Sequence, residues 1–467
     1  MRWPAAWRAR SSSTAADAVE SATLGAAPAQ GLRPARERSD QRTVAWTALA
    51  AGALIAVGGT LGDSQLLVAL GGAIIAALGA FLIPQLLLAA FLVAGGLKAA
   101  PWLAALPVDL TLLTAAGVLA AIVVRASKPD GIRPMPYATL LALALAALVG
   151  LSVIWSPAPD LGLDKALRFQ TFTMIAFFAP FVLVRSRGDL TRLMLFVVAA
   201  SLVVALTAVP GTDPNQPLTV AGGNSEIELA LYASSGIVAA IYLLLALTSP
   251  WRILLVVPAV MLAETVIAAG SRGVLIGTIF AGLVIAAMAV WRSRSKVVPI
   301  ALIACAVIAA ISFGAEVAGP AASAKYQGLF GGGAGPETLG KRNFLVQDGI
   351  QMFLAHPMGN GASGYQAEIG FPYPHNAFVE VAAEQGVIGL ALLTGLIVAA
   401  FVATRRAREG PLSPEAILTA GLLIVLVSDA MVSQTYTQFR ELWFAMGLAL
   451  AVPFIGAREP DADAPGY

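Results

Sequence analysis

Charged side chains are scarce in this chain of 467 residues. They make up 12% of it, whereas soluble domains usually carry about 25%. Hydrophobic residues make up 58%. Because so few charges cannot cover the chain with a water-facing surface, we exclude a soluble globular protein and interpret the chain as an integral membrane protein. The small net charge of +2 gives no basis for a nucleic-acid partner.

Cysteine and histidine are nearly absent. The single cysteine, Cys305, lies in an apolar stretch, which excludes a disulfide framework and indicates a small packing residue. The two histidines form no His/Cys cluster that would predict a metal site. The early loops also lack a DxD or paired-carboxylate motif, because Asp63 and Asp109 stand alone. We therefore expect no cofactor and a reaction that does not depend on a metal.

Long apolar runs are abundant instead. Runs of about 17 to 22 residues recur with short Pro, Gly and charged breaks, a pattern typical of helices that cross a hydrocarbon core of about 30 Å. The alternating pattern of a membrane β-barrel is missing. We predict an all-α polytopic membrane protein with about fourteen transmembrane helices, at 43–62, 65–83, 85–103, 107–124, 137–155, 166–184, 190–210, 226–247, 251–270, 273–291, 297–318, 376–403, 414–432 and 437–456.

The lysines and arginines predict which side each loop faces, because short cytoplasmic loops hold more of them than external loops. With the N-terminus inside, only eight of the 29 fall outside: Lys98, Lys165, Arg168, Arg272, Lys325, Lys341, Arg342 and Arg440. We therefore predict that both ends are cytoplasmic. Residues 1–42 and 457–467 are expected to be disordered tails around a transmembrane domain at 43–456, and the first tail is too polar for a signal peptide.

One long polar, glycine-rich segment, residues 319–374, interrupts the apolar pattern. The predicted topology places it outside, in the periplasm of a Gram-negative cell, and loops of this length are usually functional. Residues 338–355 are predicted to form a short helix that lies on the membrane surface or against the helix bundle. His356-Pro357 should end this helix, and three glycines permit a tight turn after it: Gly359, Gly361 and Gly364.

His375 stands between the polar segment and the next apolar run. Asn376 is a good N-cap for the helix that begins there. The positive end of the helix dipole disfavours a protonated imidazole, so a histidine at this position is suited to act as a general base near neutral pH. The alternative is that His375 only packs or caps.

Several cations also stand on the predicted outer face. Arg272 lies in a very short turn between two apolar runs, where it either binds an anion or reaches toward lipid phosphates. Arg342, and less clearly Lys341, lies in the first turn of the surface helix, where it can face a phosphate or be a solvated charge. Two further arginines at outer helix ends are interpreted as interfacial anchors: Arg168 and Arg440.

These residues together suggest a reaction. Two arginines and a neutral histidine on one face suit an anionic leaving group and a hydroxyl nucleophile, and the departure of diphosphate fits that description. Glu228 and Glu264, inside predicted helices, are either polar links between helices or proton-relay groups of a transporter. A transporter of lipids or solutes, coupled through these glutamates and Asp429, would leave the long polar segment unexplained, and no internal repeat supports it.

Five short motifs occur in order along the chain: Ser271-Arg272-Gly273, Lys341-Arg342, His356-Pro357-Met358-Gly359-Asn360-Gly361, Pro374-His375-Asn376 and Glu384-Gln385-Gly386-Val387-Ile388-Gly389. As an ordered set they resemble the signature of the O-antigen ligase and O-antigen polymerase superfamily, over roughly residues 220–400. The first four predicted helices carry no such motif.

The resemblance implies a bacterial inner-membrane glycosyltransferase that uses an undecaprenyl-diphosphate-linked glycan as donor, with its active site facing the periplasm in the loop 319–375. By carry-over, His375 would deprotonate the acceptor hydroxyl, while Arg272 and Arg342, with Lys341, would hold the diphosphate. A single in-line displacement would invert the anomeric carbon. The candidate supporting residues are Arg168, Arg440, Asn376 and Glu384.

The acceptor separates two activities of the superfamily. Its polymerases transfer the glycan to another lipid-linked glycan, and its ligases transfer it to lipid A core. Ligases commonly look like twelve-helix proteins, so the predicted number of helices favours a polymerase, with a ligase as the alternative.

Overall fold

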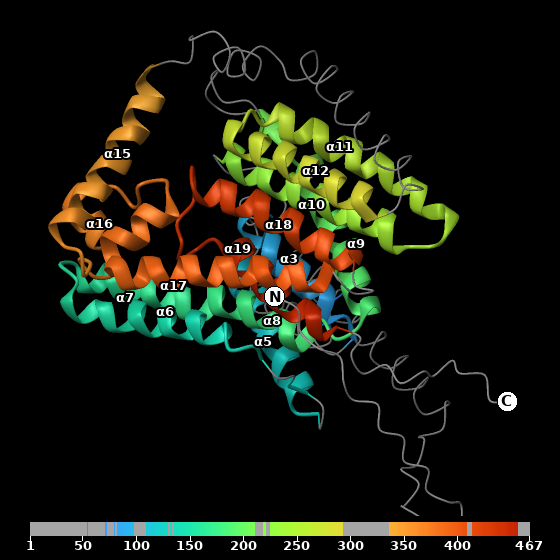
Figure 1. Cartoon of the computed structure of the whole chain (residues 1–467), viewed down its shortest axis with the longest axis horizontal. Coiled ribbons are helices and arrows are strands. Elements are labelled where there is room, and N and C mark those ends of the chain that lie inside the picture. Colours follow the sequence, from blue (N-terminus) through green and yellow to red (C-terminus); the bar gives the residue numbers. More distant parts are fainter. Residues whose placement is uncertain are drawn as a thin grey trace, which may run out of the picture. The chain divides into compact units, whose positions relative to one another are not determined.

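The computed structural model describes residues 54, 71, 79, 82–97, 109–128, 131–132, 135–210, 218–220, 225–292, 336–408 and 413–455. All of them belong to one compact unit, Thr47–Tyr467. The described helices are α3 (Pro84–Leu97), α5 (Leu110–Ala126), α6 (Thr139–Leu151), η1 (Ser152–Trp155), α7 (Pro159–Arg168), η2 (Phe169–Thr173), α8 (Met174–Leu183), α9 (Arg187–Leu206), α10 (Glu226–Ala246), η3 (Pro250–Leu255), α11 (Val256–Ala268), α12 (Arg272–Arg292), α15 (Pro336–Ala355), α16 (Gly364–Ile369), α17 (Ala377–Arg408), α18 (Ser413–Ala430), α19 (Arg440–Ala451) and η5 (Val452–Phe454) (Figure 1).

The predicted helical class is confirmed. Apart from the helices, the described residues hold one antiparallel pair of two-residue strands, β1 (Val209–Pro210) and β2 (Leu218–Thr219). Among the described residues, five helical stretches are long and apolar enough to cross a membrane: Pro159–Leu183, Arg187–Leu206, Glu226–Ala246, Pro250–Ala268 and Ala377–Ala407. Four shorter apolar helices accompany them: Pro84–Leu97, Leu110–Ala126, Thr139–Trp155 and Arg272–Met288.

The described helices begin and end close to the predicted apolar runs. Three of those runs, 43–62, 65–83 and 297–318, lie almost wholly outside the described residues, as do both predicted tails. The total of about fourteen crossings and the sidedness of the loops therefore stay predictions.

Side-chain caps fix where several helices begin. Ser186 and Asp189 form a capping box at α9, and Asp109 accepts hydrogen bonds from the backbone of the first turn of α5. Asn376 Oδ1 accepts hydrogen bonds from the backbone nitrogens of Phe378 and Val379, at 3.0 and 3.1 Å. The predicted N-cap at Asn376 is thus confirmed, and α17 begins at the next residue.

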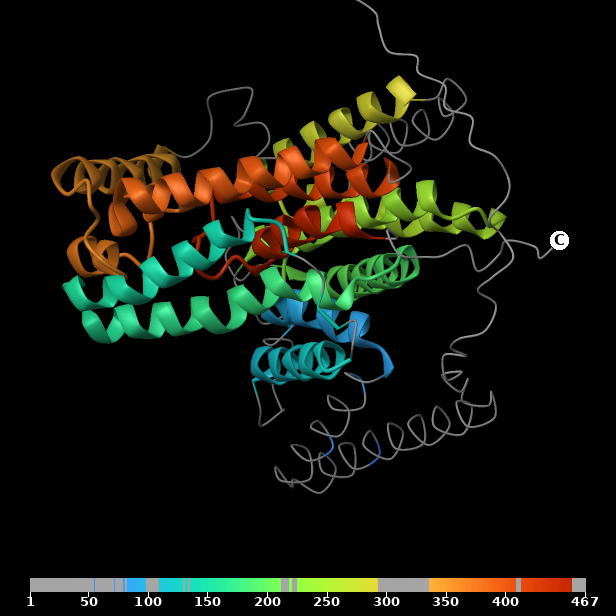
Figure 2. The same ribbon diagram turned by 60° about the horizontal axis from the view of Figure 1, so that its bottom comes forward.

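The core is a bundle in which α10 packs against α9, α11 and α18, while α19 packs against α8 and α18. α17 lies along α6 and contacts α18 and α19 as well (Figure 2). Gly447 allows the close approach of α19 to α8, because a Cβ there would meet the carbonyl of Phe177. Aromatic rings fill the centre, with Phe169 and Trp443 in edge contact at 5.0 Å between centroids.

The short helix predicted at 338–355 is present as α15, which ends at Ala355, directly before His356-Pro357. α15 packs against α16 and α17 (Figure 1). Tyr365 of α16 fastens it, because its hydroxyl donates a hydrogen bond to the carbonyl of Leu345 at 2.9 Å. Residues 319–335 lie outside the described residues, and the external position of the segment stays a prediction.

Candidate functional site

The turn that follows α15 enters a break in α17. At Gly386 the backbone of α17 is not helical, with φ +68° and ψ −163°. The turn 357–361 bonds to the backbone beside the break through three hydrogen bonds: Asn360 N to Ala383 O at 3.0 Å, Gly361 N to Glu384 O at 2.8 Å and Val387 N to Pro357 O at 2.9 Å. The turn therefore satisfies backbone groups that the break would otherwise leave unpaired. We call residues 357–361 and 383–387 the α17 lock.

Two glycines make the lock sterically feasible. Gly359 has φ +88°, and a Cβ at this position would lie 2.5 Å from both the Glu384 carbonyl oxygen and the Gly386 nitrogen. A Cβ at Gly386 would lie 2.5 Å from the Pro357 carbonyl oxygen. Neither position admits a larger residue without movement of the backbone. The motifs His356–Gly361 and Glu384–Gly389, which support the family resemblance, thus meet in space and shape α17.

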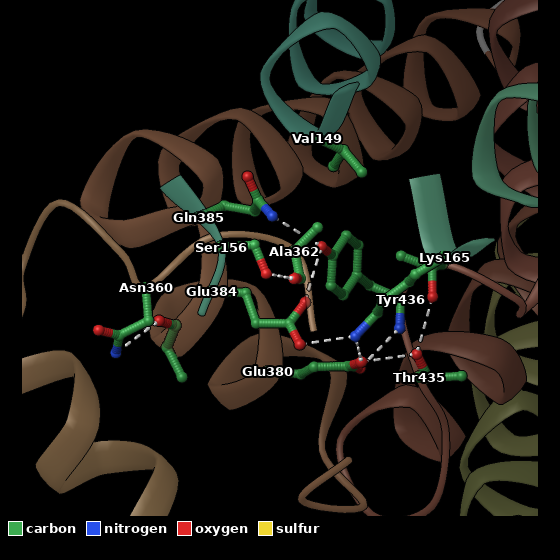
Figure 3. A network of polar contacts seen from close by, with 12 residues as sticks. Val149, Ser156, Lys165, Asn360, Ala362, Glu380, Glu384, Gln385, Thr435 and Tyr436 are labelled. Atoms are coloured by element: carbon green, nitrogen blue, oxygen red, sulfur yellow. Dashed lines mark hydrogen bonds and ion pairs between the residues drawn. The ribbon is translucent and has the colours of Figure 1, made fainter. Parts of the chain in front are cut away.

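Next to the lock lies a buried ion network. Lys165 of α7 places its Nζ 2.6 Å from Glu380 Oε1 and 2.7 Å from Glu384 Oε1 (Figure 3). The two glutamates are one turn apart on α17, and both side chains are 0% exposed. Such buried charges are tolerated only when they are paired and hydrogen-bonded. Glu384, a predicted supporting residue of the site, has its carboxylate in this network.

The network extends into the loop between α18 and α19. Thr435 Oγ1 donates to Glu380 Oε1 at 2.8 Å, and Tyr436 N donates to Glu380 Oε2 at 3.1 Å. The Tyr436 hydroxyl donates to Glu384 Oε2 at 3.2 Å. Every carboxylate oxygen of the two glutamates therefore has at least one donor, and the loop 431–436 is fastened to α17 (Figure 3). Sequence reasoning identified neither Lys165 nor Glu380 as part of this arrangement.

His375 lies against the same loop. Its Nδ1 is 3.4 Å from the carbonyl oxygen of Ser433, and its ring makes an edge contact with Tyr373 at 4.8 Å between centroids. Asn376 Nδ2 donates to the carbonyl oxygen of Met431 at 2.7 Å. Because a carbonyl only accepts, a hydrogen bond from Nδ1 makes Nε2 the basic nitrogen of the neutral ring. This orientation suits a general base.

The backbone of His375 is also unusual. Its φ is +58°, in the left-handed region, where residues other than glycine are uncommon. Holding a side chain in such a conformation costs about 1–3 kcal/mol and persists when the surroundings impose it. Here the cap by Asn376 and the contacts with the loop 431–436 impose it.

The structure brings the start of α12 to the same loop. α12 begins at Arg272, after the left-handed Gly270, and Gly273 packs against Val432, where a Cβ would lie 2.5 Å from Val432 Cγ2. The starts of α12 and α17, with Arg272 and His375, therefore flank residues 431–433.

Arg342 lies on α15, and its charge acts at Tyr373. Burial raises the pKa of the Tyr373 hydroxyl, the carboxylates of Glu380 and Glu228 raise it further, and Arg342 lowers it. The charge of Arg342 therefore acts on Tyr373, whose ring contacts the ring of His375. Lys341 precedes it on α15, and its side chain lies outside the described residues.

A cavity of about 530 Å³ opens beside these residues. It lies between α3, α5, α7 with η2, α10, the segment before α17 and the segment from the α18–α19 loop into α19. Its lining residues are Gly95, Asp109, Thr111, Leu112, Asp164, Arg168, Phe172, Thr173, Glu228, Leu231, Tyr232, Tyr373, Gln434, Thr435, Thr437, Gln438, Phe439, Arg440 and Glu441. Tyr373 connects it to His375 through their ring contact.

Both arginines interpreted from the sequence as interfacial anchors line this cavity. Arg168 Nε is 2.9 Å from Asp164 Oδ2 in an exposed pair. Arg440 is 8% exposed, its Nη1 donates to the carbonyl oxygen of Phe91 at 3.0 Å, and its guanidinium lies 4.9 Å from the centre of the Phe91 ring. Arg440 is therefore held inside the bundle by α3.

The acidic residues considered for a transporter are in different settings. Glu228 lies in the first turn of α10 and lines the cavity. Asp429, at the end of α18, is buried and accepts a hydrogen bond from Gln434 at 2.9 Å. Glu264 is a partly buried residue of α11. Among the described residues, no three His, Cys, Asp or Glu side chains are grouped so that they could hold a metal ion.

A model of the O-antigen ligase family matches residues 257–394. The matched region runs from α11 into α17 and contains all five motifs noted in the sequence. The match confirms the resemblance to the O-antigen ligase and polymerase superfamily. No curated protein matches the chain.

Proposed function

We propose that this protein is a glycosyltransferase that moves a glycan from an undecaprenyl-diphosphate donor to a hydroxyl of a second glycan, at the periplasmic face of the bacterial inner membrane. The observation that carries the proposal is the placement of His375. Its ring lies at the start of α17, with Nδ1 facing the Ser433 carbonyl, on the loop whose Val432 packs against Gly273, the residue after Arg272 at the start of α12. The family match supplies the class of chemistry.

The proposed reaction is a single displacement. Nε2 of His375 takes the proton of the acceptor hydroxyl, and the acceptor oxygen forms a bond to the anomeric carbon. The bond from that carbon to the diphosphate oxygen breaks, and the diphosphate leaves with the electron pair. The configuration at carbon is inverted, and no metal ion is needed for any step.

The proposed leaving group is stabilised by cations. Arg272 and Arg342 hold the diphosphate as its charge develops, with Lys341 beside Arg342 on α15. The position of Arg272 at the first turn of α12 adds the positive end of a helix dipole to its guanidinium. Asn376 acts indirectly, because its two hydrogen-bonded ends fasten α17 to the loop 431–436 and so position His375.

We place a polymerase ahead of a ligase because about fourteen transmembrane helices are predicted from the apolar runs. A polymerase extends a lipid-linked glycan, whereas a ligase transfers the glycan to lipid A core. Deletion of the gene in its native bacterium distinguishes the candidates.

Loss of a polymerase should leave single repeats on the final acceptor. Loss of a ligase should leave polymerised glycan on the carrier lipid. Trapping of the lipid-linked repeat inside the cell would instead show a transporter and contradict the proposal. Electrophoresis of surface glycans and analysis of extracted carrier lipids provide both measurements.

A further inference from the structure

The cavity beside His375 has a lining of a particular chemical kind. Hydroxyl and amide side chains come from Thr111, Thr437 and Gln438, and rings come from Phe172, Tyr232, Tyr373 and Phe439. Three more polar side chains of the lining donate hydrogen bonds within the chain: Thr173, Gln434 and Thr435. Its volume of about 530 Å³ lies within the usual range of small-molecule sites. Groups that exchange hydrogen bonds, mixed with flat apolar rings, suit a ligand with many hydroxyls and apolar ring faces.

The charges of the lining disfavour an anion. Four carboxylates line the cavity, from Asp109, Asp164, Glu228 and Glu441, against two guanidinium groups. Arg168 is paired with Asp164, and Arg440 is held by the Phe91 carbonyl and ring. With both arginines engaged in this way, the lining offers a diphosphate little positive charge. Carboxylates accept hydrogen bonds from sugar hydroxyls well, so the lining favours a neutral sugar.

The cavity also leads to the proposed base. Tyr373 lines it, and the Tyr373 ring is 4.8 Å from the His375 ring between centroids. Gln434 and Thr435 line it as well, directly after Ser433, whose carbonyl faces His375 Nδ1. A sugar that fills the cavity therefore lies beside Tyr373, the ring neighbour of His375.

We infer that this cavity binds neutral sugar residues of the acceptor glycan and presents their hydroxyl to His375, an inference that rests on the proposed function. Glu228 is assigned as an acceptor of sugar hydroxyl hydrogen bonds, and Gln438 as a further polar contact. The donor diphosphate is assigned to Arg272 and Arg342, outside this cavity.

The test measures binding without turnover. The probe is the oligosaccharide repeat released from the carrier lipid of the native strain by mild acid, titrated by calorimetry into the purified full-length protein. Loss of a charged hydrogen-bond partner should weaken binding by about 10-fold or more in Glu228→Gln. The matched control is Glu226→Gln, on the same turn of α10 but outside the cavity lining, which should bind as the wild type does.

A second measurement addresses the charge argument. Inorganic pyrophosphate at millimolar concentration should not displace the oligosaccharide from the wild type. Displacement by pyrophosphate, or equal binding by wild type and Glu228→Gln, would overturn the assignment. Thermal unfolding of each variant shows whether the protein has remained folded. If Glu228→Gln does not fold, Gln438→Ala is used in its place and should also bind the oligosaccharide more weakly than the wild type.

The two proposals fail in different ways. If His375→Ala leaves glycan transfer unchanged while Glu228→Gln weakens oligosaccharide binding, the proposed base is wrong and the cavity assignment stands. If His375→Ala abolishes transfer while Glu228→Gln binds normally, the proposed function stands and the cavity assignment is wrong.

Discussion

The start of α17 and the part of the helix that follows it differ in the burial and hydrogen bonding of their polar side chains. Glu380 and Glu384 are 0% exposed, every oxygen of their carboxylates has a donor, and Lys165 lies within 2.7 Å of both. His375 is only partly buried and its Nδ1 contact is 3.4 Å long. Both regions carry motif residues of one family, so membership of a motif does not reveal a role. For the two glutamates the contacts do indicate a role, because a buried carboxylate whose oxygens are all hydrogen-bonded within the chain stabilises the fold.

The largest expected effect is on stability, from Lys165→Met. Removal of the cation leaves two buried carboxylates without a charge partner, which typically costs about 3–5 kcal/mol. We expect a strong fall in the melting temperature of the purified protein in detergent, or loss of folded protein altogether. Arg168→Met on the same helix is the control, because its pair with Asp164 is exposed and such pairs contribute about 0–1 kcal/mol. Equal melting temperatures for Lys165→Met and wild type would refute the structural role.

A second effect should fall on turnover and spare stability. Arg272→Ala and Arg342→Ala should each reduce glycan transfer by about 10²- to 10³-fold, as expected when a donor to a developing anion is lost. Lysine substitutions should recover only part of the rate, because an ammonium lacks the bidentate fork of a guanidinium. Wild-type rates in Arg272→Ala would mean that this arginine only contacts lipid phosphates. Transfer from a purified lipid-linked donor is the measurement.

A smaller effect on stability is expected from a substitution in the α17 lock. It distinguishes the cost of a steric clash from the cost of a left-handed backbone conformation. Gly386→Ala places a Cβ 2.5 Å from the Pro357 carbonyl at a left-handed φ of +68°, and we expect a destabilisation of about 1–3 kcal/mol. Gly370 also has a left-handed φ, +76°, but its Cβ would meet nothing within 4 Å. Gly370→Ala should therefore cost only the strain of the left-handed backbone, about 1 kcal/mol. If denaturant unfolding gave the same loss for both variants, the close approach of the turn 357–361 would not matter.

The sequence predicts the local features of this region well. The helices at the apolar runs, the end of α15 before His356-Pro357 and the cap at Asn376 each depend on neighbouring residues, and they are present where the structure describes the chain. The pairing of Lys165 with Glu380 and Glu384 spans more than two hundred residues of sequence, so no local pattern identifies the partner. A signal did exist, because two glutamates four apart inside an apolar helix require a cation.

Two other features depended on tertiary packing. The glycines of the motifs indicated a tight turn. The structure shows that glycine is needed there because the backbone of a second motif lies directly against them. Arg440 was interpreted as an interfacial anchor because it begins a helix at the predicted outer edge. Its burial depends on the contact with Phe91 of α3, far away in the sequence, which the position alone does not reveal.

His375→Ala tests most directly whether His375 is the group that takes the acceptor proton. Transfer from purified lipid-linked donor should fall by about 10²- to 10⁴-fold, the usual contribution of a general base. Donor binding and the melting temperature should stay at wild-type values, the wild-type rate should survive EDTA, and the rate should fall at acidic pH because a protonated imidazole cannot accept the proton. Full transfer by His375→Ala, or loss of wild-type transfer on chelation, would contradict the account.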